Sequence, residues 1–156
     1  MTWLLFALMT ALFFGLYGVF LHTGQIGMKD PDMGRYKAFL FVGIAYLLAA
    51  VIGSALMLLA GEASWSFPAK GAFWSTMAGL AGAFGAFGIL LSFGAKGTPA
   101  VVMSIVFAGA PIVNAFAAAI AHPPEGGWGN VQWPFYVGIL LAAAGGCLVT
   151  LYRPGS

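Results

Sequence analysis

The chain has 156 residues, of which 62% are hydrophobic and 6% are charged, and its formal net charge is +2. Apolar runs of roughly 20 residues recur along it, which is typical of helices that cross a lipid bilayer. So few charged side chains exclude a nucleic-acid-binding surface, which needs a dense basic patch. We therefore expect an all-α, polytopic membrane protein with one domain over residues 1–156, the lipid bilayer around it and no nucleic-acid partner.

Five apolar segments are long enough, at about 1.5 Å per residue, to cross a hydrocarbon core of about 30 Å. They cover residues 3–22, 36–61, 73–94, 99–122 and 133–152. Because lipid offers no partner to backbone N–H and C=O groups, each segment is predicted to be a helix. The fourth and fifth segments open with Pro99 and Pro134, at positions where the missing N–H of proline costs nothing.

The basic residues predict how the chain is oriented. Those that follow the first, third and fifth segments are Lys29, Arg35, Lys37, Lys96 and Arg153. The opposite side has only Lys70. By the positive-inside rule the N-terminus is outside and the C-terminus is cytoplasmic, in a multi-pass protein of the cell membrane, or the inner membrane of a Gram-negative bacterium. The tryptophans then all lie at the outer boundary, which suits their amphipathic rings: Trp3, Trp65, Trp74, Trp128 and Trp133.

Glycines leave several faces of the third predicted helix without large side chains. Gly79, Gly82, Gly85 and Gly88 follow one another in steps of three, so they drift around the helix by about half a turn. Small residues let neighbouring helices approach closely in a membrane, and close packing is one interpretation. The other is a thin wall beside a substrate path, in which Gly82 and Gly85 contact the substrate.

The stretch "FAGAPIVNAF" places Pro111 and Asn114 inside the fourth segment. Pro111 cannot donate to the carbonyl of Phe107, so a kink is expected there. An asparagine within the membrane is costly unless it is paired. Asn114 therefore either bonds a neighbouring helix, which contributes about 0.6 to 2 kcal/mol, or contacts a ligand.

Other polar residues of the spans are weaker candidates. Tyr17, towards the cytoplasmic end of the first segment, is a further candidate for substrate contact. His22 is interpreted as an interfacial residue, with a proton relay as the alternative. Ser54, Ser92 and Ser104 are each expected to bond back to a carbonyl of their own helix.

Catalysis and metal binding have no support in the sequence. No charged residue lies in the interior of a predicted span, which argues against carboxylate-driven antiport within this chain. No nucleophile and base are arranged together, and no metal motif is present. Cys147 has no second cysteine to pair with, and His122 with Glu125 are too few for a metal site. We expect no enzyme, no cofactor and no metal.

Three stretches carry a family resemblance. They are "LLFALMTALFFGLYGVFLHTG", "GILLSFGAKGTPAVVMSIVFAGAPIVNAFAAAI" and "WPFYVGILLAAAGGCLVTLYRP". Together they resemble one EamA-type repeat of five helices from the drug/metabolite transporter superfamily, over nearly the whole chain. The resemblance implies a half-size transporter whose cavity is lined by the third and fourth helices, here the Gly79 to Gly88 face, Pro111 and Asn114. Family repeats often place a glutamate directly after the fourth helix, where this chain has His122 and two prolines before Glu125.

The charge bias favours a fixed orientation and therefore a partner, which is either a parallel copy in a homo-oligomer or an oppositely oriented homologous subunit. The expected function is a half-size transporter subunit that moves a small-molecule substrate by alternating access around a midplane site. The alternative is a structural or accessory membrane subunit that transports nothing. In that case Asn114 and the glycines serve helix packing.

Overall fold

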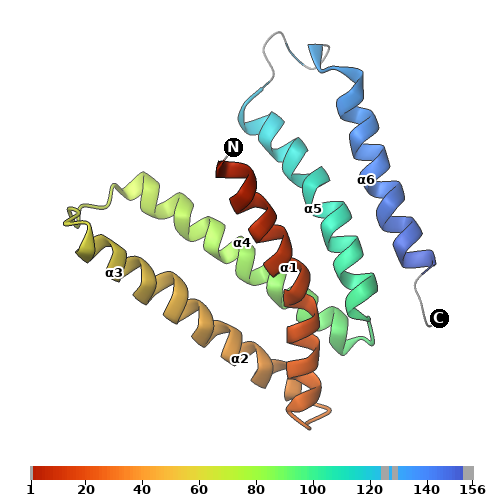
Figure 1. The fold of residues 1–156 in the computed structure, drawn as a ribbon, viewed down its shortest axis with the longest axis horizontal. Helices are drawn as coiled ribbons and strands as arrows, with labels where there is room; N and C mark the ends of the chain where they lie inside the picture. Colours follow the sequence, from red (N-terminus) through yellow and green to blue (C-terminus); the bar gives the residue numbers. More distant parts are fainter. Residues whose placement is uncertain (1, 124–126, 128–129, 153–156) are drawn as a thin grey trace. The chain divides into compact units, whose positions relative to one another are not determined.

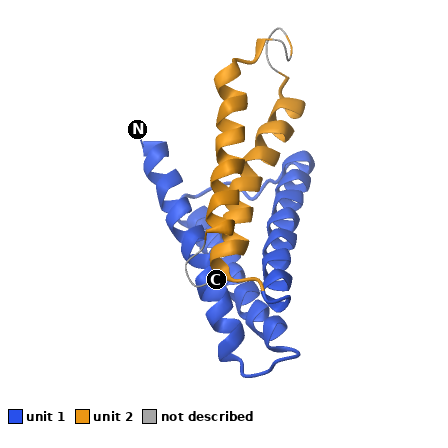
Figure 2. Ribbon diagram, turned by 90° about the vertical axis from the view of Figure 1, so that its right-hand side faces the viewer, with its two compact units in different colours: residues 1–96 blue, residues 97–156 orange. Residues whose placement is uncertain are grey.

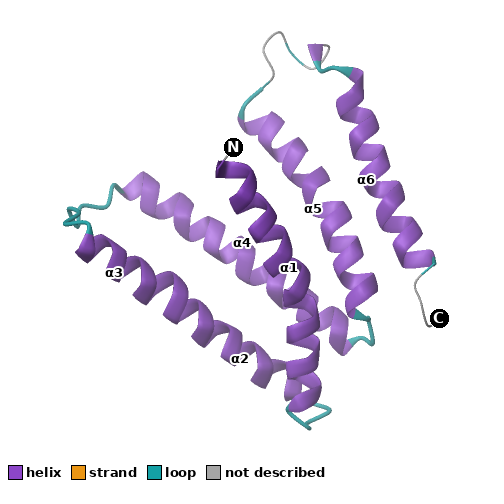
Figure 3. Ribbon diagram, viewed as in Figure 1, coloured by secondary structure: helices purple, strands orange, loops and turns teal. Residues whose placement is uncertain are grey.

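The computed structural model describes residues 2–123, 127 and 130–152, which form helices and connecting turns with no strand among them (Figure 1 and Figure 3). The helices are α1 (Thr2–Gly27), α2 (Gly34–Tyr46), the π-helix η1 (Leu47–Ile52), α3 (Gly53–Ala60), α4 (Ala69–Gly94), α5 (Pro99–Ala121) and α6 (Trp133–Leu151). Since α2, η1 and α3 run on without a break, the described residues contain five helices long and apolar enough to cross a membrane. The prediction of an all-α chain with five such segments is confirmed.

Two helix boundaries differ by four or more residues from those expected, and the others agree within two residues. The first span continues past His22 to Gly27, and the third begins at Ala69 instead of residue 73. In both places hydropathy marks where apolar side chains stop, whereas backbone hydrogen bonding carries the helix further into the polar boundary layer. Pro68, with φ −57° and ψ 130°, sets the start of α4 because its extended conformation precedes the first helical residue.

The second span changes its hydrogen-bond register at η1. There the Gly53 N–H donates to the carbonyl of Leu48, five residues back instead of four. A π-helical segment is rare and widens the helix locally. Ser54, which follows directly, makes no side-chain hydrogen bond with the described residues. The expectation that it bonds its own helix is therefore not met.

The other two serines behave as expected. The Ser92 hydroxyl donates to the carbonyl of Gly88 at 2.9 Å, and the Ser104 hydroxyl donates to the carbonyl of Ala100 at 2.6 Å. Such bonds pair a polar side chain inside its own helix, so neither serine needs a neighbouring helix or a ligand.

Backbone contacts divide the chain into two compact units, residues 1–96 and 97–156, which Figure 2 colours separately. In unit 1, α1 packs against α2, and both contact α4. In unit 2, α5 packs along α6. The single domain predicted over residues 1–156 stays a prediction.

The buried hydrophobic side chains of unit 1 gather where the end of α1, the start of α2 and the end of α4 meet. They are Leu21, Ala38, Ala86, Ile89, Leu90 and Phe93. The ring of His22 meets that of Phe93 edge-on, with centroids 5.1 Å apart, which ties α1 to α4 at this end. In contrast, η1 and α3 contact no span other than their own among the described residues. Their large apolar side chains are exposed, as lipid-facing side chains are.

A capped turn joins α1 to α2. One carboxylate oxygen of Asp30 accepts hydrogen bonds from the N–H groups of Asp32 and Met33, at 3.2 and 2.9 Å. The other carboxylate oxygen forms an ion pair with the Lys37 ammonium group, with 2.6 Å between Oδ2 and Nζ. The hydrogen bond from Lys37, followed by that from the Met33 N–H, lowers the pKa of Asp30 below its usual value of 3.8.

The two helices of unit 2 approach closely at Gly146. A side chain at Gly146 of α6 would collide with the Cβ of Ala108 on α5 and would lie 3.4 Å from the carbonyl oxygen of Ser104. A neighbouring residue, Gly145, has nothing within 4 Å of the same position. Small residues that let two backbones meet are a main source of helix association in lipid.

We expect Gly146→Ala to destabilise the α5–α6 pair by roughly 1 to 3 kcal/mol, because the added methyl group has no room against Ala108. Gly145→Ala is the matched control and should be neutral or stabilising, since alanine is the better helix former. Reversible unfolding of the purified chain in mixed micelles measures both. Equal effects of the two variants would contradict the close approach.

We also expect the carboxyl group of Asp30 to titrate below 3.8 in the folded chain and closer to that value in Lys37→Gln. Because folding lowers this pKa, the turn is stabilised above the unfolded-state pKa and loses that stabilisation as the pH falls through the folded-state pKa. Carbon NMR of the labelled carboxyl group in micelles measures the titration. Lys70→Gln, at a distant lysine, should change nothing; a wild-type pKa of 3.8 or higher would refute the interaction.

Candidate functional site

Tyr17 lies in the wall of an apolar groove between α1 and α2. The groove has a volume of about 480 Å³. It is lined from the α1 side by Phe13, Tyr17, Phe20, Leu21, Gly24 and Met28, and from α2 by Ala38, Phe41, Val42 and Ala45. The α1 positions recur at steps of three and four residues, which places them on one face of the helix. Tyr17 is the only one of these side chains that carries a polar group.

The hydroxyl oxygen of Tyr17 is buried and has no hydrogen-bond partner among the described residues. A buried polar group without a partner costs about 1 to 3 kcal/mol. A tyrosine hydroxyl in an apolar setting usually finds such a partner. The groove therefore offers one unused hydrogen-bonding group inside an apolar wall, at a volume that is ordinary for a small-molecule site.

Pro111 and Asn114 do not form one site. The helix α5 continues through Pro111, which lines a pocket of about 280 Å³ between α5 and α6 together with Phe135 and other residues of the two helices. Asn114 does not line this pocket. It lies six residues from Ala108, which faces α6, so it points about 120° away from that interface. Its side chain is exposed and makes no hydrogen bond within the described part of the chain.

The glycine face of α4 is open. Gly82 and Gly85 are exposed, and a side chain built at either position meets nothing within 4 Å among the described residues. Close packing of these glycines against another helix of unit 1 is therefore not observed. Of the five predicted site residues, Tyr17, Gly82 and Gly85 belong to unit 1, whereas Pro111 and Asn114 belong to unit 2.

A second polar cluster lies at the end of unit 1 where α1 turns into α2. Here the Gln25 side-chain oxygen and the Arg35 Nε are buried without hydrogen-bond partners among the described residues. The Arg35 guanidinium lies against Gly94, the last residue of α4, and 5.2 Å from the centre of the Tyr36 ring. In the sequence, Arg35 contributes only to the charge bias that predicts the orientation, because no pattern in the chain shows that α4 ends beside it.

Other predicted positions contribute less. His22 packs on Phe93, and its interpretation as an interfacial residue stays a prediction. Cys147 is a free, exposed thiol beside an apolar groove of about 400 Å³ between α5 and α6. No cluster of three or more His, Cys, Asp or Glu side chains that could hold a metal occurs in the described ranges. Glu125, Trp128 and Arg153 lie outside those ranges.

Tyr17 is thus the predicted site residue that combines a groove with an unpartnered polar atom, while Asn114 has the second feature alone. The groove is formed within unit 1, so its geometry does not depend on how the two units are arranged. Comparisons of the chain with protein-family models, with curated proteins and with solved structures find no match, and the resemblance to EamA-type repeats stays a prediction from the sequence.

Proposed function

We propose that this chain is a half-size subunit of a membrane transporter that moves a small metabolite by alternating access. The observation that supports this best is the buried, unpartnered hydroxyl of Tyr17 in the wall of a groove of about 480 Å³. Pockets of this size, mostly apolar with one or a few polar groups, are the usual form of small-molecule sites. No charged side chain lines the groove, which favours a neutral substrate or a neutral part of one.

The subunit is proposed to act together with a second copy of itself or with an oppositely oriented homologous subunit. Asn114 is exposed and unpartnered in a membrane-spanning helix, and an amide in that position is costly in lipid. The open surface of Gly82 and Gly85 accepts a close neighbour. Helices of a partner would pair the Asn114 amide in unit 2 and, separately, pack against the glycines of α4 in unit 1.

The second candidate function is that of a structural or accessory membrane subunit. The contact of Gly146 with Ala108 favours it, because there a small residue lets two helices pack closely. In this case Asn114 and the glycines of α4 are packing positions for a partner protein, and the groove of Tyr17 holds lipid.

Transport measured in proteoliposomes separates the two. With labelled amino acids, nucleosides and sugars as probes, we expect Tyr17→Phe to weaken the apparent affinity for the transported probe by roughly tenfold, the equivalent of one hydrogen bond. Gly24→Leu should abolish transport, because its side chain would project into the groove. Gly27→Leu is the matched control, since that glycine lies on α1 outside the groove and is exposed.

Unchanged transport in both Tyr17→Phe and Gly24→Leu would refute the groove as the substrate site. If neither the chain alone nor any pairing with co-purified membrane subunits supports flux of these probes, the accessory function is the correct one. Asn114→Ala adds a third comparison: a partner contact predicts weaker assembly in detergent with unchanged substrate affinity, whereas a ligand contact predicts the reverse.

The orientation with the N-terminus outside and the C-terminus in the cytoplasm is part of the proposal, together with residence in the cell membrane. A C-terminal green fluorescent protein should fluoresce, and a C-terminal alkaline phosphatase should be inactive, in intact cells. Phosphatase activity from that fusion would overturn the assigned orientation and, with it, the argument for a fixed one.

A further inference from the structure

Three helices of unit 1 end in a charged residue with left-handed backbone geometry. These residues are Lys29 (φ 52°) after α1, Glu62 (φ 50°) after α3 and Lys96 (φ 67°) after α4. The N–H of each donates to a carbonyl three residues back, at 3.1, 3.3 and 3.1 Å. Glycine is the common residue at such helix ends, since any side chain is strained there. Two lysines and a glutamate hold these positions in spite of that strain.

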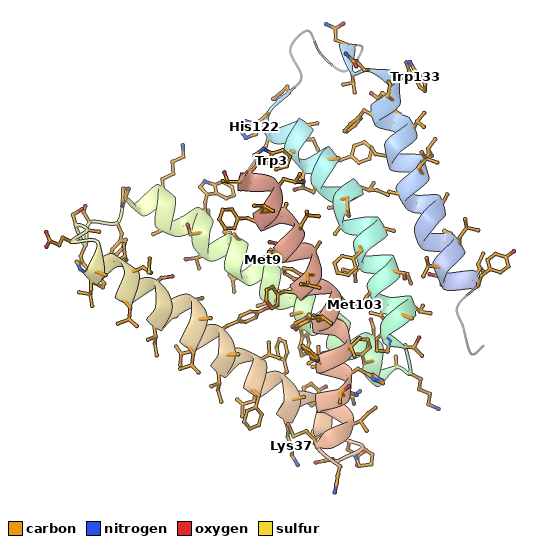
Figure 4. The ribbon with its side chains drawn as sticks, in the orientation of Figure 1. Trp3, Met9, Lys37, Met103, His122 and Trp133 are labelled. Atoms are coloured by element: carbon orange, nitrogen blue, oxygen red, sulfur yellow. The ribbon has the colours of Figure 1, made fainter. Side chains whose placement is uncertain are left out.

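The two lysines share one end of unit 1. The His22–Phe93 ring contact places the end of α1 beside the end of α4, and the guanidinium of Arg35 lies against Gly94, two residues before Lys96. Figure 4 shows Lys37 at this end and Trp3 at the opposite end of α1. Glu62 follows α3, at the far end of a continuous helical span of 27 residues, a length of about 40 Å.

The cations at this end are not equally paired. Lys37 forms an ion pair with Asp30. In contrast, Lys29, Arg35 and Lys96 form no ion pair with any described residue, and Asp32 is the only other acid nearby in the turn. Arg35 is partly buried, and its Nε has no acceptor. Three cations at one end of a unit with no ion pair among the described residues favour binding of an external anion.

We propose that this basic end, defined by Lys29, Arg35 and Lys96, binds the phosphate of an anionic phospholipid headgroup. The three cations stand where membrane-spanning helices end, so their long side chains reach the headgroup layer. A guanidinium matches the oxygen geometry of phosphate, and lysines beside it add attraction for a negatively charged leaflet. This binding is independent of transport and would hold for an accessory subunit as well.

The left-handed geometry provides a test that separates charge from folding. In the double variant Lys29→Gly, Lys96→Gly, both charges are lost while the backbone strain is relieved. The full chain in neutral phosphatidylcholine nanodiscs should therefore be at least as stable in this variant as in the wild type. Binding of phosphatidylglycerol, followed by native mass spectrometry of the detergent-solubilised chain, should weaken by roughly tenfold or more.

Glu62→Gly is the matched control, because the same backbone change at the opposite end removes an acid instead of a cation. It should leave phosphatidylglycerol binding unchanged. Arg35→Gln should weaken binding as well, and salt at about 0.5 M should weaken binding to the wild type. Phosphatidylcholine should bind the wild type and the double variant equally.

Three outcomes would overturn the proposal. The first is full phosphatidylglycerol binding by the double variant. The second is an equal loss in Glu62→Gly, which would mean that lipid binding follows helix-end geometry and not charge. The third is displacement of the lipid by inorganic phosphate at the same concentration, which would assign the basic end to a free anion.

Discussion

A lipid environment offers no hydrogen-bond partner, and this constraint governs both the fold and the choice of functional residues. It makes each apolar segment a helix, because only a helix pairs the backbone within itself. It also divides the polar side chains of the spans into those that bond their own helix and those that need another partner. Thr10, Thr76 and Thr150 donate to carbonyls of their own helices at 2.8 to 2.9 Å, so they need nothing from outside.

The polar groups without a partner in their own helix are the ones that indicate a candidate site. Tyr17 has a buried hydroxyl with no acceptor, and Asn114 has an exposed amide with no partner among the described residues. Both lie in helices of membrane-spanning length. The difference between them is the surroundings: Tyr17 stands in a groove between two helices of its own unit, whereas Asn114 faces away from the α5–α6 interface. The first arrangement suits a small ligand and the second suits a partner helix.

At the ends of the membrane-spanning helices, the charged side chains likewise divide into those with a partner and those without one. Asp30 pairs with Lys37 and accepts hydrogen bonds from the N–H groups of Asp32 and Met33 in the turn before α2. Arg35 and Lys96 have no such acid, although one is partly buried and the other holds a strained backbone conformation. Residues that break a local rule of stability without an internal compensation point to an interaction with the surroundings.

The sequence by itself determined the class of fold and most helix boundaries. Runs of apolar residues between Pro68 and Pro99, or after Pro134, are local features of the sequence, and their hydropathy predicts the helices directly. It did not predict the π-helix at η1, because the register of hydrogen bonds inside a uniformly apolar run leaves no mark on composition.

The candidate site was likewise predicted in part from the sequence and decided in part by the tertiary structure. Sequence reasoning selected Tyr17 and Asn114 from their polarity in apolar surroundings, which is a property of single residues. The tertiary structure alone decided that Tyr17 faces a groove, that Gly146 makes a close helix contact, and that Arg35 meets the end of α4. Each of these depends on which helices are neighbours and which faces they turn to one another. A single chain of nearly uniform hydropathy does not encode that in any local pattern.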